Sequence, residues 1–415
     1  MTTDQSLSVA QVADEQPDEG AAGWRTAWAS TLGLACGPSV LLTMSFGAFI
    51  DPLERAFGWG VGEIALGASL LSVAVMVISP VQGYLVDRLG GRRVILCSAP
   101  VFALGLMAMY FLPGSLSVFY LAWIALPVLG MGLWPVSYLR LTAGWFERRL
   151  GLALGVANSG IGVGTVLVPI LTAALISAFG WRVAFLGLGV VALIAVPVAF
   201  FFLAEPSMRR TSVVQASGDT LRSAAATRPF WVVMVGFLLL GMMGSSVVVH
   251  QIPLLLDAGV APSVANLVPV ALGAAMIAAR IGTGWLLDRL RVSVVMTASL
   301  ICGIVSVLVF ASGPNAVMGI VAAALAGFLI GAEFDVLSYL IPRYFGRLAF
   351  GKIYGITFSM FQIGAAISGS AVGMIRDSYD SYAPAMLVVA GVGVVSVGLF
   401  LSLGRYRYEG TVKIA

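Results

Sequence analysis

The chain has 415 residues, of which 60% are hydrophobic and 10% are charged, and its formal net charge is +4. A soluble fold of this composition would expose more contiguous apolar surface than water tolerates, which excludes a water-soluble globular protein and predicts one embedded in a lipid bilayer. The basic residues are accounted for by loops at the membrane surface, so the charge does not indicate a nucleic-acid partner.

The chain begins with an acidic segment, residues 1–23, which lacks the basic start of a signal peptide and is predicted to be a disordered cytoplasmic tail. Twelve apolar segments follow, each long enough to cross roughly 30 Å of hydrocarbon. They lie at residues 27–50, 62–84, 94–112, 117–141, 151–175, 182–203, 230–255, 263–287, 294–311, 316–340, 352–375 and 384–403.

The longest polar stretch inside the chain, residues 205–228, separates the sixth apolar segment from the seventh and is predicted to be a cytoplasmic linker. It divides the chain into residues 24–204 and 229–404, and residues 405–415 follow as a C-terminal tail. The sequence therefore predicts an all-α membrane protein with 12 transmembrane helices in two pseudo-symmetric six-helix halves.

Lysine and arginine are distributed unequally between the predicted loops. If the N-terminus is cytoplasmic, 17 of them fall in inner loops and tails, whereas only Arg55, Arg182 and Arg376 fall in outer loops. Basic loops stay on the cytoplasmic side when a membrane protein is inserted. We therefore expect a multi-pass protein of a bacterial inner membrane with both termini in the cytoplasm.

The residue patterns of enzymes and metal proteins are missing from the sequence. The three cysteines, Cys36, Cys97 and Cys302, lie in or beside apolar segments without the spacing of metal ligands. The chain has neither a phosphate-binding loop after a strand nor a nucleophile elbow. We expect no enzymatic activity, no cofactor and no metal, which argues against an ATP-driven pump or a membrane hydrolase.

A short polar motif follows the second apolar segment and returns in the second half. Residues 83–93 read GYLVDRLGGRR, and residues 284–289 read GWLLDR, about 200 positions later. In a chain with so few charges, such a cluster has to lie at the membrane surface. A nearly equal offset relates Gly151 to Gly351, so the two halves are predicted to be related repeats.

Over essentially its whole length the chain resembles the major facilitator superfamily of transporters, whose loop motif matches residues 83–93 at every defining position. The resemblance implies a cytoplasmic charge network that includes Asp87 and Arg88 and closes the inner side while the outer side is open. It also implies close helix contact at Gly83. The residues assigned to this gating motif are Gly83, Asp87, Arg88, Gly90, Arg92, Arg93, Gly284, Asp288 and Arg289.

Within this superfamily, residues 145–155 (WFERRLGLALG) and 180–182 (GWR) resemble the branch of monocarboxylate and oxalate/formate transporters. That branch implies an organic anion as substrate, often moved with a proton or exchanged for another anion. An Arg at the position of Arg280 binds the substrate carboxylate in that branch. Its Asp one turn earlier is replaced by Met276 in this chain.

Arg280 is the basic residue expected deepest in the second half. It precedes Asp288 by eight residues, about 12 Å of helix, while half of the hydrocarbon thickness is about 15 Å. An unpaired guanidinium near the midplane is costly, so we expect it to face a wet cavity or an acidic partner. Its planar fork suits a carboxylate, and Arg280 is the predicted substrate-binding residue.

Two acidic residues, Glu333 and Asp335, are expected at the same depth as Arg280, because they precede Arg343 by ten and eight residues. They are about 200° apart around the helix, so both cannot face one point. A carboxyl group at low dielectric is suited to loading and releasing a proton, and we expect one of them to couple transport to protons. The alternative is a permanent structural ion pair with Arg280.

Several further polar residues are weaker candidates. If the family architecture holds, Tyr138, Asn158, Tyr339 and Gln362 border the central cavity and contact substrate, although helix packing explains such residues about as well. His250, near the outer end of the seventh helix, is a candidate for binding or titration, or a satisfied interfacial histidine.

These features predict a monomeric secondary transporter that moves a small organic anion, a monocarboxylate or aromatic carboxylate, with a proton by alternating access. The alternative is efflux of a drug or metabolite by proton antiport, in which Glu333 or Asp335 would be the counter-charge of a cationic substrate. A non-transporting sensor would need an added output domain, which the sequence does not show.

Overall fold

The computed structural model describes residues 19–205, 218–265 and 267–408, so most of the predicted N-terminal tail and the last residues of the C-terminal tail lie outside the described residues. The first half contains α2 (Ala21–Ala35), α3 (Pro38–Leu41), α4 (Phe46–Phe57), α5 (Val61–Leu89), α6 (Gly91–Ala108), η1 (Met109–Phe111), α7 (Leu116–Leu129), η2 (Met131–Leu133), α8 (Pro135–Trp145), α9 (Leu150–Phe179), α10 (Trp181–Leu193) and α11 (Ala195–Phe201). The linker and second half contain α13 (Leu221–Ala225), α14 (Arg228–Asp257), α15 (Pro262–Ala265), α16 (Val268–Leu287), α17 (Val292–Ala311), α18 (Ala316–Tyr344), α19 (Phe350–Tyr379) and α20 (Ala383–Leu401).

The predicted spans correspond to the observed helices, but some of them are interrupted. The first span, 27–50, is divided into α2, α3 and α4, and the sixth, 182–203, into α10 and α11. Among the described residues, 11 helical segments are long and apolar enough to cross a membrane. The fourth predicted span, 117–141, is divided into α7, η2 and α8. The break follows from Gly130, which ends α7, and from Pro135, which begins α8 because it has no N–H to donate to a preceding turn.

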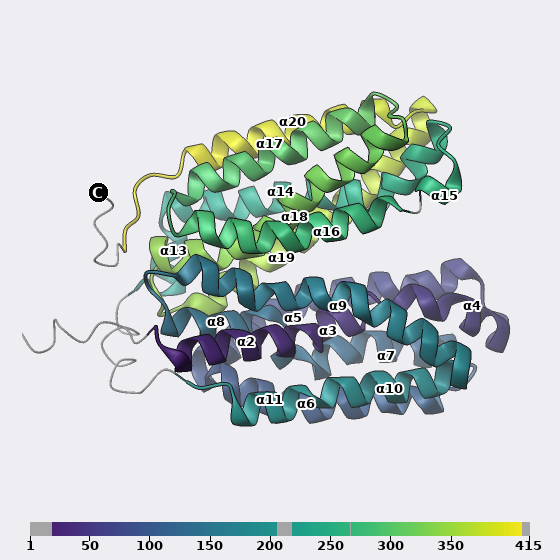
Figure 1. The fold of residues 1–415 in the computed structure, drawn as a ribbon, viewed down its shortest axis with the longest axis horizontal. Coiled ribbons are helices and arrows are strands. Elements are labelled where there is room, and N and C mark those ends of the chain that lie inside the picture. The colour runs from purple at the N-terminus through teal and green to yellow at the C-terminus, as the bar shows by residue number, and fades with distance from the viewer. Residues whose placement is uncertain (1–18, 206–217, 266, 409–415) are drawn as a thin grey trace, which may run out of the picture.

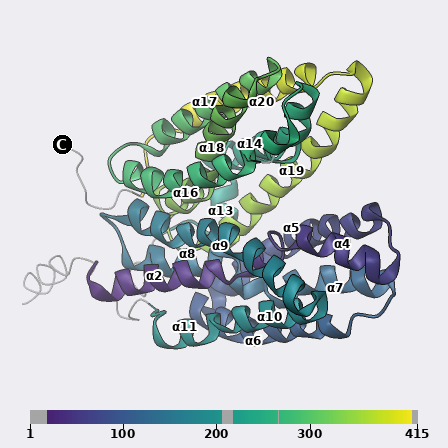
Figure 2. The ribbon, with the colours of Figure 1, turned by 45° about the vertical axis from the view of Figure 1, so that its right-hand side comes forward.

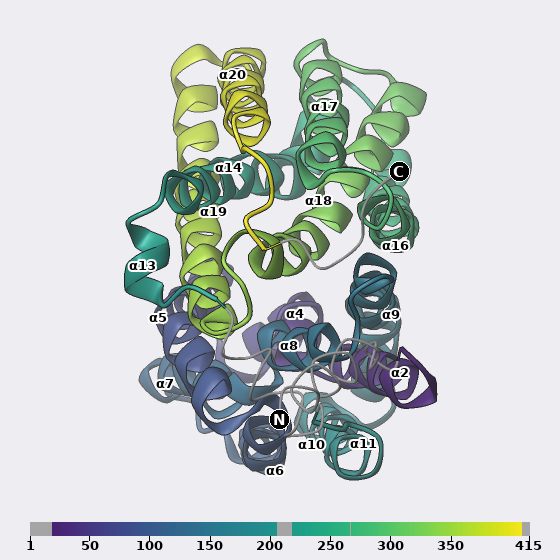
Figure 3. The ribbon, with the colours of Figure 1, turned by 90° about the vertical axis from the view of Figure 1, so that its left-hand side faces the viewer.

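The helices form two bundles that lie against each other, one from each half of the chain (Figure 1). The linker helix α13 and the C-terminal segment lie at one end of the molecule, where α2 also begins (Figure 3). We call this the linker end and the opposite one the far end. Two pairs of long helices join the bundles, α5 with α19 and α9 with α16.

Glycines let the joining helices touch backbone to backbone at the linker end. A Cβ atom on Gly284 of α16 would lie 2.5 Å from the carbonyl oxygen of Gly151 on α9, far inside normal contact distance. The other joining pair repeats this arrangement, with Gly83 of α5 against Gly351 of α19. The two crossings are related by the offset of about 200 residues that the sequence shows.

The bundles separate toward the far end. The face of α16 that meets α9 continues from Gly284 through Ile277, which packs on Gly162, to Gly273, where an added Cβ would meet nothing within 4 Å. On the facing helix, Val166 is 47% exposed. The second bundle rises away from the first toward the far end in Figure 2, which agrees with these contacts.

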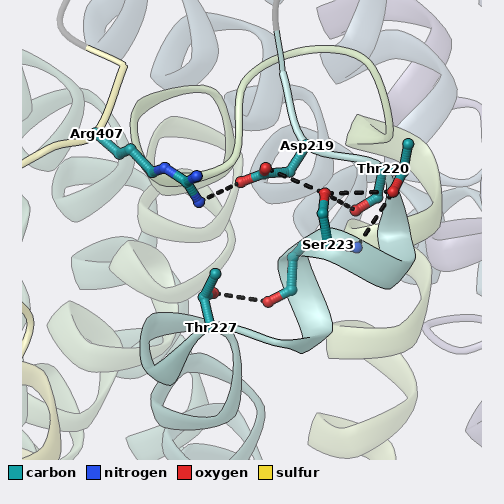
Figure 4. A network of polar contacts seen from close by, with 6 residues as sticks. Asp219, Thr220, Ser223, Thr227 and Arg407 are labelled. Carbon is teal, nitrogen blue, oxygen red and sulfur yellow. Dashed lines mark hydrogen bonds and ion pairs between the residues drawn. The ribbon is translucent and has the colours of Figure 1, made fainter.

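At the linker end, the linker helix is tied to the C-terminal segment (Figure 4). The Asp219 carboxylate accepts hydrogen bonds from Arg407 Nη1 at 2.9 Å and from Ser223 Oγ at 3.1 Å. Thr220 caps α13, because its Oγ1 accepts the backbone N–H of Ser223 at 3.2 Å. The backbone N–H of Arg407 donates to the carbonyl oxygen of Arg343, so the segment is also fastened to the end of α18.

Candidate functional site

Arg280 lies in the interior of the molecule on α16, at the level where α9 crosses. Its side chain is almost completely buried, with a relative exposure of 2%. A Cβ on Gly155 of α9 would lie 2.5 Å from the Arg280 carbonyl oxygen, so the first half presses directly on the backbone here. Within the described residues, Arg280 Nε and Nη1 have no hydrogen-bond partner, and no carboxylate forms an ion pair with the guanidinium within 4.0 Å.

The two acids of α18 are buried at the same level but point in different directions. Asp335 Oδ1 accepts a hydrogen bond from Asn158 Nδ2, which comes from α9 of the other half. Glu333 turns toward α14, where its Oε2 lies 3.9 Å from the position of a Cβ built on Gly244. Asp335 therefore contacts the interface between the halves, whereas Glu333 points into the second bundle.

Arg280 lies within electrostatic range of both carboxyl groups and of the Tyr354 hydroxyl on α19. In the described part of the chain, Glu333 Oε2 and Asp335 Oδ2 have no hydrogen-bond partner. Buried polar atoms are normally paired, so unpaired ones at one level indicate a place where a polar ligand is received. The cluster supplies one fixed cation, two carboxyl groups and free donors at the guanidinium, which suits an anion and a proton.

The remaining substrate candidates are spread over the molecule. Tyr138 is fully buried within the first bundle, where its ring packs against Gly33 of α2. Tyr339 lies toward the linker end, with the Arg343 guanidinium 5.2 Å from the centre of its ring. Gln362 is half-buried on α19.

His250 lies inside the second bundle, beyond the level of Glu333 toward the far end. Its Nε2 is 3.2 Å from the carbonyl oxygen of Gly369 on α19, and its ring centre is 5.6 Å from that of Tyr382. These contacts satisfy the imidazole through α19 and the start of α20, away from the Arg280 cluster.

The two motif aspartates join the halves at the linker end. Asp87 of α5 accepts the backbone N–H groups of Gly351 at 2.9 Å and Lys352 at 3.0 Å, the first turn of α19. Asp87 also pairs with Arg140 of α8, whose Nε is 3.3 Å from Oδ1. A carboxylate at a helix N-terminus is stabilised by the unpaired N–H groups and the helix dipole.

Asp288, at the end of α16 in the second half, makes the equivalent contact with the first half. It accepts the backbone N–H groups of Gly151 at 2.6 Å and Leu152 at 2.9 Å, the first turn of α9. Burial raises the pKa of Asp288 to about 6, although these hydrogen bonds and Arg343 lower it. Each half therefore caps a helix of the other.

The other motif residues shape the surface of their own half. Gly90 has φ +87°, a conformation that favours glycine. Arg88 donates to Tyr84 Oη at 3.0 Å. The remaining motif arginines contact neighbouring groups or solvent: Arg92 donates to the Ala199 and Phe200 carbonyl oxygens, Arg93 is exposed, and Arg289 lies over the Trp285 ring.

Three arginines outside the motif complete the contacts at the linker end, and the sequence analysis did not predict these contacts. Arg343 Nη2 donates to the Glu147 carbonyl oxygen at 3.2 Å, and Arg347 Nη2 donates to the Phe146 carbonyl oxygen at 3.0 Å, so both reach the other half. Arg140 is the ion partner of Asp87. The sequence does indicate the depth of Arg140: it lies five residues before the end of α8, and Asp87 lies close to the end of α5, so the two are near the same level.

The comparison with known families agrees with this architecture. The sequence model of the Major Facilitator Superfamily matches residues 32–369. The chain belongs to the Major Facilitator Superfamily. The predicted resemblance and the predicted all-α transporter fold are thereby confirmed.

Relatives and solved structures of this superfamily cover almost the whole chain. Monocarboxylate transporter 13 of Bos taurus is 26% identical over 400 residues, which are 94% of this chain and 91% of the relative. The E. coli fucose:proton symporter FucP has a similar fold, with a TM-score of 0.69 at 16% identity over 92% of this chain and 96% of FucP. A FucP structure in the outward conformation gives a TM-score of 0.70 at 15% identity, over 91% and 97% of the two chains.

Proposed function

We propose that this superfamily member is a secondary transporter that binds a small organic monocarboxylate at Arg280 and carries it together with a proton. The observation that supports this most is the buried Arg280 guanidinium, whose Nε and Nη1 have no partner among the described residues. The names of a monocarboxylate transporter among its relatives and of a proton symporter among its structural neighbours agree with the substrate class and with the coupling ion.

Charge balance in the cluster supports the coupling. With Arg280 positive, one ionised carboxyl group makes the empty site neutral, and a second ionised carboxyl group would leave an unbalanced charge at low dielectric. A bound substrate carboxylate takes over as the counter-charge of Arg280, so the ionised acid has to gain a proton. One anion and one proton then move together, and the loaded site is neutral.

The separation of the bundles supplies the path by alternating access. With the linker end on the cytoplasmic side, as the basic loops indicate, the contacts of Asp87 and Asp288 close the inside while the far end is open. Rocking of the two halves, residues 24–204 and 229–404, about the Arg280 level then exchanges the open side. The protein acts as a monomer in the bacterial inner membrane, because each chain contains both halves of the site.

The proposal is tested by uptake into proteoliposomes of radiolabelled pyruvate, lactate and benzoate, with and without an inward proton gradient. Wild type is expected to show gradient-stimulated uptake of at least one acid. Arg280→Ala removes the cation and should abolish it, whereas Arg280→Lys keeps the charge without the fork and should retain a small part. Uptake that is indifferent to Arg280→Ala would reject the proposal.

The excess of acids over bases in the cluster favours one competing function, export of a cationic drug or metabolite in exchange for protons. In that case Glu333 would be the counter-charge, since it points into the second bundle and its Oε2 has no hydrogen-bond partner in the described ranges. Ethidium export in inverted vesicles that survives Arg280→Ala and is lost in Glu333→Gln would establish this function instead.

A further inference from the structure

Asn158 is fully buried in the middle of α9, and its amide reaches across the interface between the halves to Asp335. We propose that Asn158 is a positioning residue that holds Asp335 ionised in the empty site and thereby selects Asp335, and not Glu333, as the proton carrier. This inference rests on the proposed function and assigns a role within that site.

The geometry separates the two acids. Asp335 receives an N–H donor from Asn158, and a donor to a carboxylate favours the ionised form. Glu333 Oε2 faces Gly244, which has no side chain to donate, and it has no hydrogen-bond partner among the described residues. The site needs only one ionised acid to balance Arg280, so Asp335 carries the charge and Glu333 remains protonated.

The surroundings of Asp335 contain few other ionisable groups. Arg280 faces it from α16, Tyr354 from α19 and Glu333 from its own helix. The facing helix α9 contributes only the neutral Asn158 amide. An amide is suited to this position, because its N–H group donates to the carboxylate and its carbonyl oxygen accepts the O–H of the protonated acid.

The transport step is a proton transfer that conserves charge. In the empty site Asp335 is a carboxylate and neutralises Arg280. When a monocarboxylate binds Arg280, a hydronium ion from the open side gives its proton to Asp335, an O–H bond forms, and water is left. The substrate carboxylate replaces Asp335 as the counter-charge, and the sequence reverses when the site opens to the other side.

The experiment measures pyruvate, lactate or benzoate uptake, whichever wild type transports, at pH values from 5 to 9, and determines KM at each pH. Wild type is expected to show a KM that rises above one midpoint pH, where Asp335 stays ionised. Asn158→Ala removes the donor and should move this midpoint upward by about one pH unit. Asp335→Asn should abolish the pH dependence of KM. Adding Asn158→Ala to Asp335→Asn should then leave the pH profile of KM unchanged.

Ser359→Ala is the matched control. Ser359 Oγ donates to the Met76 carbonyl oxygen at 2.6 Å, another hydrogen bond between the halves that involves no acid, so its loss should leave the midpoint unchanged. If Asn158→Ala does not reconstitute, Asn158→Ser repeats the test, because its side chain is too short to reach Asp335.

Two results would overturn the inference. A KM raised by the same factor at every pH would make Asn158 a substrate ligand, and an unchanged KM and midpoint would make it a packing residue. The proposed function fails in a different way: it is rejected if the wild-type protein transports none of the three acids.

Discussion

Gly284→Ala is expected to open the linker end. The added Cβ would lie 2.5 Å from the Gly151 carbonyl oxygen, and ordinary contact begins at 3.4 Å, so α16 and α9 have to move apart by about 0.9 Å. The same movement stretches the hydrogen bonds of Asp288 to Gly151 and Leu152, now 2.6 and 2.9 Å, to the edge of hydrogen bonding.

The size of the effect follows from these two hydrogen bonds. Weakening two charge-assisted bonds at a partly exposed site costs about 1.5 kcal/mol, which corresponds to a roughly tenfold change in the ratio of closed to open molecules. Double electron–electron resonance measures this ratio directly. The spin labels are placed on exposed positions of the two halves, Arg148→Cys and Leu290→Cys, after replacement of the native cysteines, Cys36, Cys97 and Cys302, by alanine.

Gly282→Ala is the control, because it lies two residues away on the same helix and its added Cβ meets nothing within 4 Å. We expect its distance distribution to match that of the unsubstituted protein, whereas Gly284→Ala adds a longer distance. Identical distributions for both variants would refute the reasoning, since they would show that the glycine contact does not hold the linker end closed.

Three further predictions concern the charged contacts of the linker end. The closed state should gain population as pH falls through about 6, because Asp288 binds its proton more tightly when buried than when opening exposes it to water, and the same spin labels measure this. Arg140→Gln should lower the melting temperature in detergent by several degrees, since it leaves the buried Asp87 carboxylate without its ion partner, and Asp87→Asn in the same chain should restore part of the loss. Arg407→Ala should lower the melting temperature by no more than about 2 °C, because this arginine is mostly exposed. Asp219→Ala should lower the melting temperature further, because the Asp219 side chain is buried.

The sequence predicts much of the fold because each span carries its own signal. Helical rise from a surface residue predicts one depth for Arg280, Glu333 and Asp335, and the structure buries all three within electrostatic range of one another. The break in the fourth span was missed because its apolar run is continuous. Gly130 and Pro135, which end and begin the two helices, were the local signals that outweighed hydropathy.

The partners of the charged residues were not predictable in the same way. A hydrophobic segment fixes the depth of a residue, whereas its direction depends on how the helix is rotated against its neighbours. The bond between Asn158 and Asp335 joins residues 177 positions apart, and the pair of Arg140 and Asp87 joins helices whose rotation follows only from packing. The position of Arg140 in the sequence indicates its depth, and only the packing of α8 against α5 shows that its partner is Asp87.

The backbone of the interface is symmetric, and its chemistry is not. Ser79 of α5 presents its carbonyl oxygen to Gly355 in the way that Arg280 of α16 presents its own to Gly155, and the two positions differ by 201 residues. Similar crossings on both sides of the interface let either bundle rock over the other. The guanidinium of Arg280 has no counterpart at Ser79, so only one of the two crossings carries a cation. A substrate carboxylate therefore meets one binding site and not a symmetric pair. The glycine crossings should therefore determine how readily the molecule changes its open side, and Arg280 with its acids should determine what crosses.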